Sequence, residues 1–134
     1  MKLTNHLDTD IDTRLVCRCG CGYGSKELDW NIDLLIAFEI IRSKLCFELE
    51  QEIGITINSG CRCKSHNATI PNASPNSYHC KGMALDLLCP KGVNYETFYN
   101  ICEEVIGEKG GIGKYTNKNF VHIDVRGKRK RWGS

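Results

Sequence analysis

The sequence predicts one α+β domain in which a long helix packs on a small antiparallel sheet. Three observations support this prediction. The length of 134 residues suits a single domain with one hydrophobic core. Apolar residues recur at helical spacing in two stretches, whereas shorter stretches alternate or are rich in β-branched residues. Neither an internal repeat nor a linker divides the chain.

Composition narrows the class of protein. Hydrophobic residues make up 41% and charged residues 25%, which is typical of a globular protein and excludes general disorder. The net charge of +2 gives no reason to expect a dedicated nucleic-acid partner, and no apolar run is long enough for membrane insertion. The N-terminus lacks the apolar centre of a signal peptide, which predicts synthesis in the cytoplasm. We expect a monomer.

The first half of the chain predicts an arm, a tight loop and a helix. Residues 1–16 are mostly polar and predict a mobile or lightly packed arm, followed by a domain over residues 17–134. Cys17, Cys19 and Cys21 lie among glycines and predict a tight loop. A helix is predicted over residues 28–53, before Gly54, from apolar positions at three- and four-residue steps: Leu28, Ile32, Leu35, Ile36, Ile40, Leu45 and Leu49.

The second half predicts a sheet with one further helix. Alternation and β-branched residues indicate strands at residues 55–59, 83–88 and 119–125, and a strand or turn begins at residues 110–113. Residues 64–77 are rich in Asn, Ser and Pro and predict a surface loop. A second amphipathic helix is predicted over residues 95–106, and the basic tail after residue 125 is interpreted as a solvated face.

Two histidines stand beside strands with a carboxylate at short spacing. His79 precedes a strand that carries Asp86 among apolar residues, and burial of that carboxylate requires a compensating group such as a cation. His122 and Asp124 alternate with apolar residues and therefore lie on one face of the last strand. Two imidazoles and one carboxylate form the ligand set of a catalytic zinc ion. A structural His–Asp pair without a metal fits the same spacing.

The motif Ser77-x-His79-x-x-Gly82-x-Ala84-x-Asp86, followed by His122, resembles the zinc motif of the M15 metallopeptidases. This family contains D-alanyl-D-alanine carboxypeptidases and phage endolysins and shares its fold with the hedgehog signalling proteins. Residues 58–62, Asn-Ser-Gly-Cys-Arg, resemble the Ser-Gly-x-Arg motif of the family, and residues 111–113 and 120–124 resemble its last strand pair. The resemblance extends over residues 17–132.

This resemblance implies that His79, Asp86 and His122 hold one catalytic zinc ion. It further implies that Arg62 binds a carboxylate of the substrate through a forked contact. The alternative for Arg62 is a surface salt bridge. For Ser77, substrate binding and capping of the turn are both open.

The group that activates water is the point where this chain departs from its relatives. Many members of the family carry an acidic residue three positions before the last histidine, or a histidine two positions before it, where this chain has Asn119 and Phe120. Asp124 shares the strand face of His122, so we predict that Asp124 is the general base. Orientation of a ligand imidazole is the alternative role for Asp124. Glu108, in the loop before residue 110, is a second candidate for the base.

The resemblance implies a zinc peptidase that cuts peptide bonds of bacterial peptidoglycan. The scissile bond would follow a D-alanine or join L-alanine to an acidic residue. A phage-type endolysin fits a single domain without a signal peptide, and it would reach the cell wall after holin-type release or as a virion component. The first alternative is a catalytically inactive zinc-binding module for wall recognition or virion structure. The second is a carboxypeptidase that acts on soluble dipeptides.

Nine cysteines without a secretion signal predict thiols or metal ligands rather than a disulfide framework. The clusters at residues 17–21 and 61–63 permit a second, structural zinc site. Their one-residue spacing differs from the roughly two to four residues usual between zinc ligands, so packed, reduced thiols are the preferred interpretation.

Overall fold

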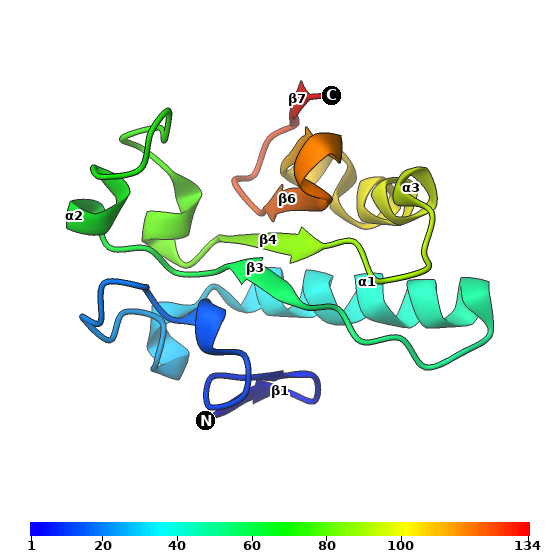
Figure 1. Ribbon diagram of the computed structural model, residues 1–134, viewed down its shortest axis with the longest axis horizontal. Coiled ribbons are helices and arrows are strands. Elements are labelled where there is room, and N and C mark those ends of the chain that lie inside the picture. The colour runs from blue at the N-terminus through cyan, green and yellow to red at the C-terminus, as the bar shows by residue number, and fades with distance from the viewer.

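The computed structural model of the protein describes residues 1–134 and contains two sheets, three α-helices and several short 3-10 helices (Figure 1). The N-terminal part comprises β1 (Lys2–Thr4), β2 (Leu7–Asp8), η1 (Thr13–Leu15), η2 (Glu27–Asp29), α1 (Ile32–Leu49), β3 (Ile57–Ser59) and α2 (Lys64–Asn67). The C-terminal part comprises η3 (Tyr78–Lys81), β4 (Ala84–Leu88), α3 (Tyr95–Ile106), η4 (Gly107–Lys109), β5 (Gly111–Tyr115), η5 (Thr116–Lys118), β6 (Phe120–Asp124) and β7 (Lys130–Gly133).

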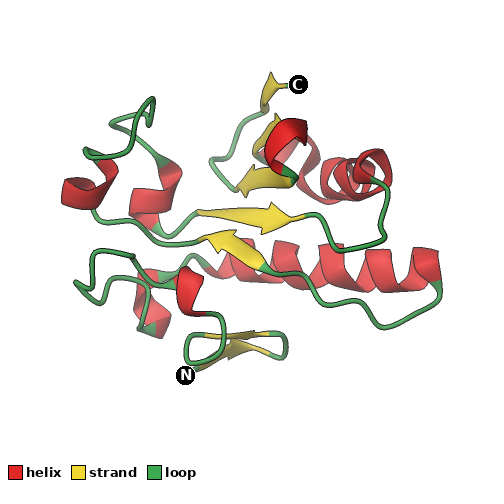
Figure 2. Cartoon of the chain, viewed as in Figure 1, coloured by secondary structure: helices red, strands yellow, loops and turns green.

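The main sheet has the strand order β3-β4-β6-β5-β7. Its pairs are antiparallel apart from β5 and β7, which run parallel. Helix α1 extends along the direction of β3 and β4, and α3 packs against α1 (Figure 2). Side chains of both helices and the sheet, such as Phe38, Leu85 and Phe98, form one continuous core. The predicted α+β domain is therefore confirmed.

Helix α1 begins and ends at capping residues. The Asn31 side chain accepts a hydrogen bond from the Asp33 backbone N–H at 2.8 Å, and Glu50 leaves the helix with φ at 54°. The helix is thus shorter than predicted and ends before Gly54. Its buried face carries Leu34, Phe38, Ile41 and Leu45, whereas several residues assigned to that face by periodicity are exposed, namely Leu28, Ile32, Ile36 and Ile40. The predicted buried face was wrong at those positions.

Residues 1–16 are packed against the domain. Strands β1 and β2 form a small antiparallel hairpin, and the side chains of Leu7 and Leu15 are almost fully buried in the core. The predicted mobile or lightly packed arm was therefore wrong, because these apolar side chains and hydrogen bonds from Thr4 and His6 to Glu39 hold it on the domain.

Most of the remaining elements follow the prediction closely. Helix α3 occupies the predicted residues 95–106, and β3, β4 and β6 lie within the predicted strands. The predicted loop at 64–77 begins with the single turn of α2, and the basic tail contains β7, which no sequence pattern indicated. None of the helices combines the length and apolar character needed to cross a bilayer.

Candidate metal centre

Strand pairing brings the predicted metal ligands together. Asp86 lies on β4 and His122 on β6, and the antiparallel register places these two residues directly opposite each other. His79 lies on η3, which precedes β4. All three residues are buried. The group predicted from the sequence is therefore one spatial cluster.

Short-range contacts fix the position of η3. The Ser77 side chain accepts a hydrogen bond from the His79 backbone N–H at 3.2 Å and so caps this turn. Gly82 ends η3 with φ at 65°, and a Cβ there would lie 1.9 Å from the carbonyl oxygen of Asp29. Only glycine therefore allows the chain to turn into β4 at this close approach.

The donor atoms of the three residues converge on one point. Asp86 Oδ1 lies 3.2 Å from His79 Nε2 and 2.9 Å from His122 Nδ1. One potential ligand atom of each residue lies within 4.8 Å of the other two. These distances suit the simultaneous contact of all three with one ion.

The second nitrogen of each imidazole is held by an acceptor. His79 Nδ1 lies 2.7 Å from the carbonyl oxygen of Gly60, and His122 Nε2 lies 2.8 Å from Asp124 Oδ2. Because these oxygens only accept, both nitrogens donate, and in the neutral imidazoles the lone pairs of His79 Nε2 and His122 Nδ1 face Asp86. Two lone pairs directed at a carboxylate repel it unless a proton or a metal cation lies between them. The donor set therefore fits a metal ion, with each imidazole oriented as metal-ligating histidines usually are.

The charges of the site also favour a cation between these side chains. Burial opposes ionisation of Asp86, but the imidazoles of His79 and His122 outweigh it and hold the pKa of Asp86 below its usual range. Burial also opposes a charged His122, yet Asp124 and Asp86 raise the pKa of its imidazole to about 8. A positive charge between these side chains is thus favoured, and either a proton on His122 or a metal ion supplies it.

Asp124 is fully buried and its carboxylate is saturated with donors. Its Oδ1 accepts from the Gly111 backbone N–H at 2.8 Å and from Arg126 Nε at 2.9 Å. Its Oδ2 accepts from Arg126 Nη2 at 2.7 Å and from His122 Nε2 at 2.8 Å. Burial opposes its ionisation, but the hydrogen bonds from Arg126 and His122 hold the pKa of Asp124 below the usual range. These contacts favour the orienting role over that of a base.

A sequence model of the Peptidase M15 family matches residues 14–124, which is most of the chain. The chain belongs to the peptidase M15 family. No curated protein and no solved structure matches it. Membership in this family and the convergent ligand set together identify a metallopeptidase centre.

Aromatic and basic side chains wall the M15 centre on the side of the C-terminal strand. The Trp132 ring lies 5.0 Å from the His122 ring, and its Nε1 donates to Tyr115 Oη at 2.9 Å. Gly113 makes room for this indole, since a Cβ there would lie 2.6 Å from it. The Arg126 guanidinium lies 5.2 Å from the Trp132 ring. The sequence interpretation of the tail as a solvated face missed the role of Arg126, whereas packing of Trp132 on the domain was considered and is observed.

Arg62 of the M15 peptidase follows the β3 strand end and forms no ion pair. Its Nη1 donates to Asn67 Oδ1 at 2.9 Å and its Nη2 to Ser59 Oγ at 3.3 Å, and the Arg62 backbone N–H donates to the carbonyl oxygen of His79 at 3.1 Å. The surface salt bridge considered for Arg62 is therefore not formed. Glu108, the second candidate for a base, is exposed and pairs with Arg129 at 2.8 Å.

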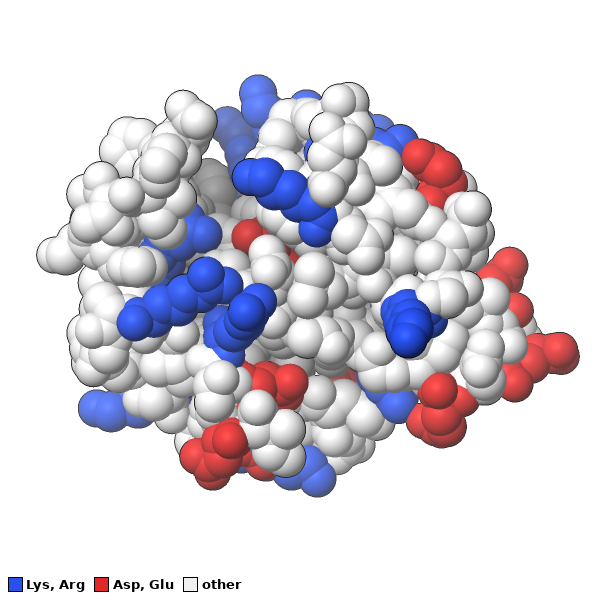
Figure 3. All heavy atoms as spheres, viewed as in Figure 1, with Lys and Arg blue, Asp and Glu red and all other residues white.

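The surface around this M15 centre is hollowed. In the space-filling view a depression opens over the start of β4, next to η3, and Lys and Arg side chains border it (Figure 3). A bordering positive potential favours the approach of an anionic ligand.

Proposed function

We propose that the protein is a zinc-dependent peptidase that cleaves peptide bonds of bacterial peptidoglycan. The observation that supports it best is the orientation of both imidazoles, whose free lone pairs face Asp86 because Gly60 and Asp124 hold the opposite nitrogens. Two histidines and one carboxylate leave a position open, as in catalytic zinc sites. Zinc in such a site supplies a Lewis acid that polarises a carbonyl group and produces a nucleophile from water at neutral pH.

Each residue has a defined task in this proposal. His79, Asp86 and His122 hold the ion, and Asp124 keeps the His122 ring in the required tautomer. Arg62 lacks an acidic partner within the chain and presents its forked guanidinium to a substrate carboxylate. Peptidoglycan peptides offer such carboxylates, both at a terminal D-alanine and on acidic residues. Either a D-Ala-D-Ala carboxypeptidase or an endopeptidase between L-alanine and an acidic residue satisfies these contacts.

The biological setting that we propose is that of an endolysin-like enzyme. As a monomer it would act on the cell wall after holin-type release, or as a virion component. Its partner is the peptidoglycan peptide.

One observation favours a catalytically inactive wall-recognition or virion module as the second candidate. Asp124 is a carboxylate that contacts a ligand histidine without being a ligand itself. Both of its oxygens already accept hydrogen bonds from other groups. A general base needs a free lone pair within reach of the proton that it removes. A binding module has no such requirement.

Digestion of purified peptidoglycan separates the two candidates. We expect clearing of the substrate by the zinc-loaded protein, loss of clearing with a chelator and recovery on addition of zinc, because the ligands alone supply no Lewis acid. Mass spectrometry of the released muropeptides identifies the scissile bond. Binding to the wall without cleavage of any muropeptide would establish the inactive module, and cleavage of soluble dipeptides alone would establish the dipeptidase alternative.

Arg62→Lys tests the proposed contact with a substrate carboxylate. Lysine keeps the charge but cannot form the forked contact. Transition-state stabilisation should therefore fall by about 1.5–3 kcal/mol, which lowers kcat/KM roughly 10- to 150-fold with zinc still bound. The matched control is Arg42→Lys, since Arg42 lies on α1 and pairs with Glu52 at 2.8 Å. Unchanged kinetics in Arg62→Lys would assign Arg62 a purely structural role in holding Asn67 and Ser59.

A further inference from the structure

Four cysteines from two distant segments gather at a second place in the molecule. Cys17, Cys19 and Cys21 lie in the loop between η1 and η2, and Cys63 precedes α2. The Sγ atoms of all four lie within 4.8 Å of one another. We propose that Cys17, Cys19, Cys21 and Cys63 form a second metal site, a four-thiolate zinc site that joins the N-terminal loop to the strand end carrying Arg62.

The distances fit tetrahedral coordination. The Sγ atoms of Cys17 and Cys19 lie 3.4 Å apart, and those of Cys19 and Cys63 lie 3.6 Å apart. A zinc–sulfur bond of about 2.3 Å gives a tetrahedron whose sulfur atoms are about 3.8 Å apart. The thiols therefore already stand close to the edge lengths of a zinc tetrathiolate site, and they are too far apart to be disulfides.

Backbone amides point at the sulfur atoms. The Cys63 N–H donates to Cys17 Sγ at 3.4 Å, and the His66 N–H donates to Cys63 Sγ at 3.3 Å. Such donors favour the thiolate, which is the form that binds a metal. In a cluster of four neighbouring thiolates the negative charges repel one another, so a divalent cation is needed to hold the thiolates together.

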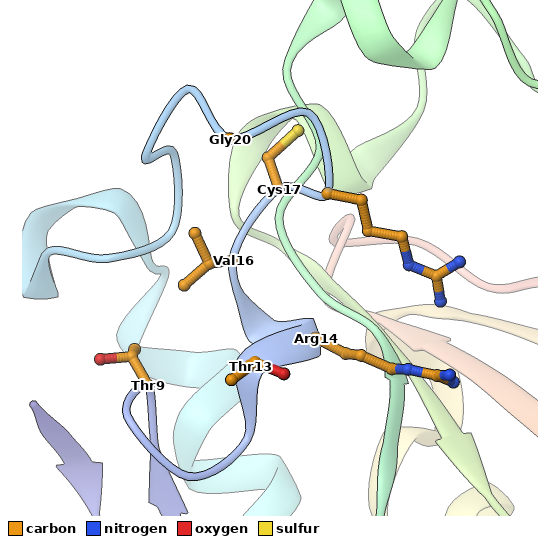
Figure 4. Close-up of a pocket in the computed structure, with 7 residues that line it drawn as sticks. Thr9, Thr13, Arg14, Val16, Cys17 and Gly20 are labelled. Carbon is orange, nitrogen blue, oxygen red and sulfur yellow. The ribbon is translucent and has the colours of Figure 1, made fainter.

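The loop geometry explains how cysteines separated by a single residue can bind one ion. Gly20 and Gly22, on either side of Cys21, have φ at 86° and 88°, a conformation that other residues rarely adopt. These turns fold the loop on itself, so that neighbouring cysteines meet without the longer gap that a regular zinc finger uses. Figure 4 shows the Cys17 side chain directed into this loop and away from Thr9 and Thr13.

The remaining cysteines do not join this cluster. Cys61 is buried, and its thiol donates to the Asp29 carbonyl oxygen at 3.9 Å. Cys46 lies on α1, where its sulfur accepts from the Ile53 N–H at 3.3 Å. Cys46 is therefore a suitable control cysteine.

The proposed ion would stiffen the peptide-binding side of the centre. Cys63 follows Arg62 directly, and the Arg62 N–H donates to the carbonyl oxygen of His79. On the other side of this segment the Cys61 N–H donates to the Leu15 carbonyl oxygen at 2.8 Å. The cysteine site would thus hold residues 60–63 from the N-terminal loop, while Gly60 in the same segment orients His79.

Zinc counting with two sets of variants tests the proposal. We expect two zinc ions per chain in the protein purified under reducing conditions, two in Cys46→Ser, and one in the double variant Cys19→Ser/Cys21→Ser. Cys19 and Cys21 are exposed, so their replacement removes ligands without opening the core. The double variant His79→Ala/His122→Ala should also retain one ion. One zinc in the wild-type protein and the same content in the cysteine double variant would overturn the proposal.

Cobalt substitution gives a readout that does not depend on zinc stoichiometry. In His79→Ala/His122→Ala loaded with cobalt(II), we expect sulfur-to-metal charge-transfer absorption, which the cysteine double variant should lack. Exposed Cys19 and Cys21 should also resist alkylation until a chelator is added. Absence of the charge-transfer band in the histidine variant would refute the cysteine site, whereas zinc retained there beyond the cysteine-bound ion would instead refute the proposed peptidase centre.

Discussion

Asp86→Asn is expected to empty the histidine centre of zinc and to abolish peptide hydrolysis. The Asp86 carboxylate lies within 3.2 Å of both imidazole nitrogens that face it, and it supplies the single negative charge of the ligand set. Asparagine keeps the shape but loses that charge, and its neutral amide oxygen is a weaker ligand for zinc than a carboxylate oxygen. The loss of activity should exceed the roughly 10- to 100-fold typical of groups that only orient the ligands.

Metal analysis and a muropeptide assay measure this effect. Asp33→Asn is the matched control, because Asp33 is an exposed carboxylate at the start of α1. The control should retain wild-type zinc content and activity. If Asp86→Asn bound zinc at the histidine centre as the wild-type protein does, the assignment of Asp86 as a ligand would be wrong.

Asp124→Asn should weaken zinc binding about 10- to 100-fold and leave kcat within a factor of a few once zinc is saturating. Asparagine has one acceptor oxygen in place of two. If that oxygen keeps the hydrogen bonds from Gly111 and Arg126, the amide NH2 group faces His122 Nε2 and cannot accept from it. The His122 ring then loses the acceptor that fixes its tautomer. A general base would behave differently, because its removal costs roughly two to four decades in kcat at equal zinc content.

The two roles of Asp124 are therefore separated by a zinc titration of activity. Glu103→Gln is a matched control, since Glu103 is a carboxylate that pairs with Arg129 and Arg131 away from the centre. A loss of kcat that persists at saturating zinc in Asp124→Asn alone would restore Asp124 as the base.

Sequence periodicity predicted α3 and misassigned part of α1 for a physical reason. Helix α3 has one apolar stripe, so its buried positions Phe98, Ile101 and Cys102 are unambiguous. Helix α1 carries apolar residues on more than one face, with Phe38 buried and Ile36 half-exposed. Where two stripes compete, only the tertiary packing decides which of them is buried.

Some residues of the candidate site could be predicted from the sequence and others could not. His79, Asp86 and His122 were predictable because their residue types and spacing form a motif. The carbonyl of Gly60 was not, since a backbone acceptor leaves no mark in the sequence. The sequence allowed Trp132 to pack on the domain, but not its place beside His122, which depends on the parallel pairing of β7 with β5.

Because Asp86 pairs directly with His122 across β4 and β6, metal binding depends on the correct register of these two strands. Side chains alternate between the two faces of a sheet, so a slip of one residue would send one ligand to the opposite face. These two residues are 36 apart in the chain, and such distant pairings are costly to close. In the proposed enzyme a newly made chain would therefore acquire its metal ion only after the central strands have paired correctly, and misregistered chains would remain without it.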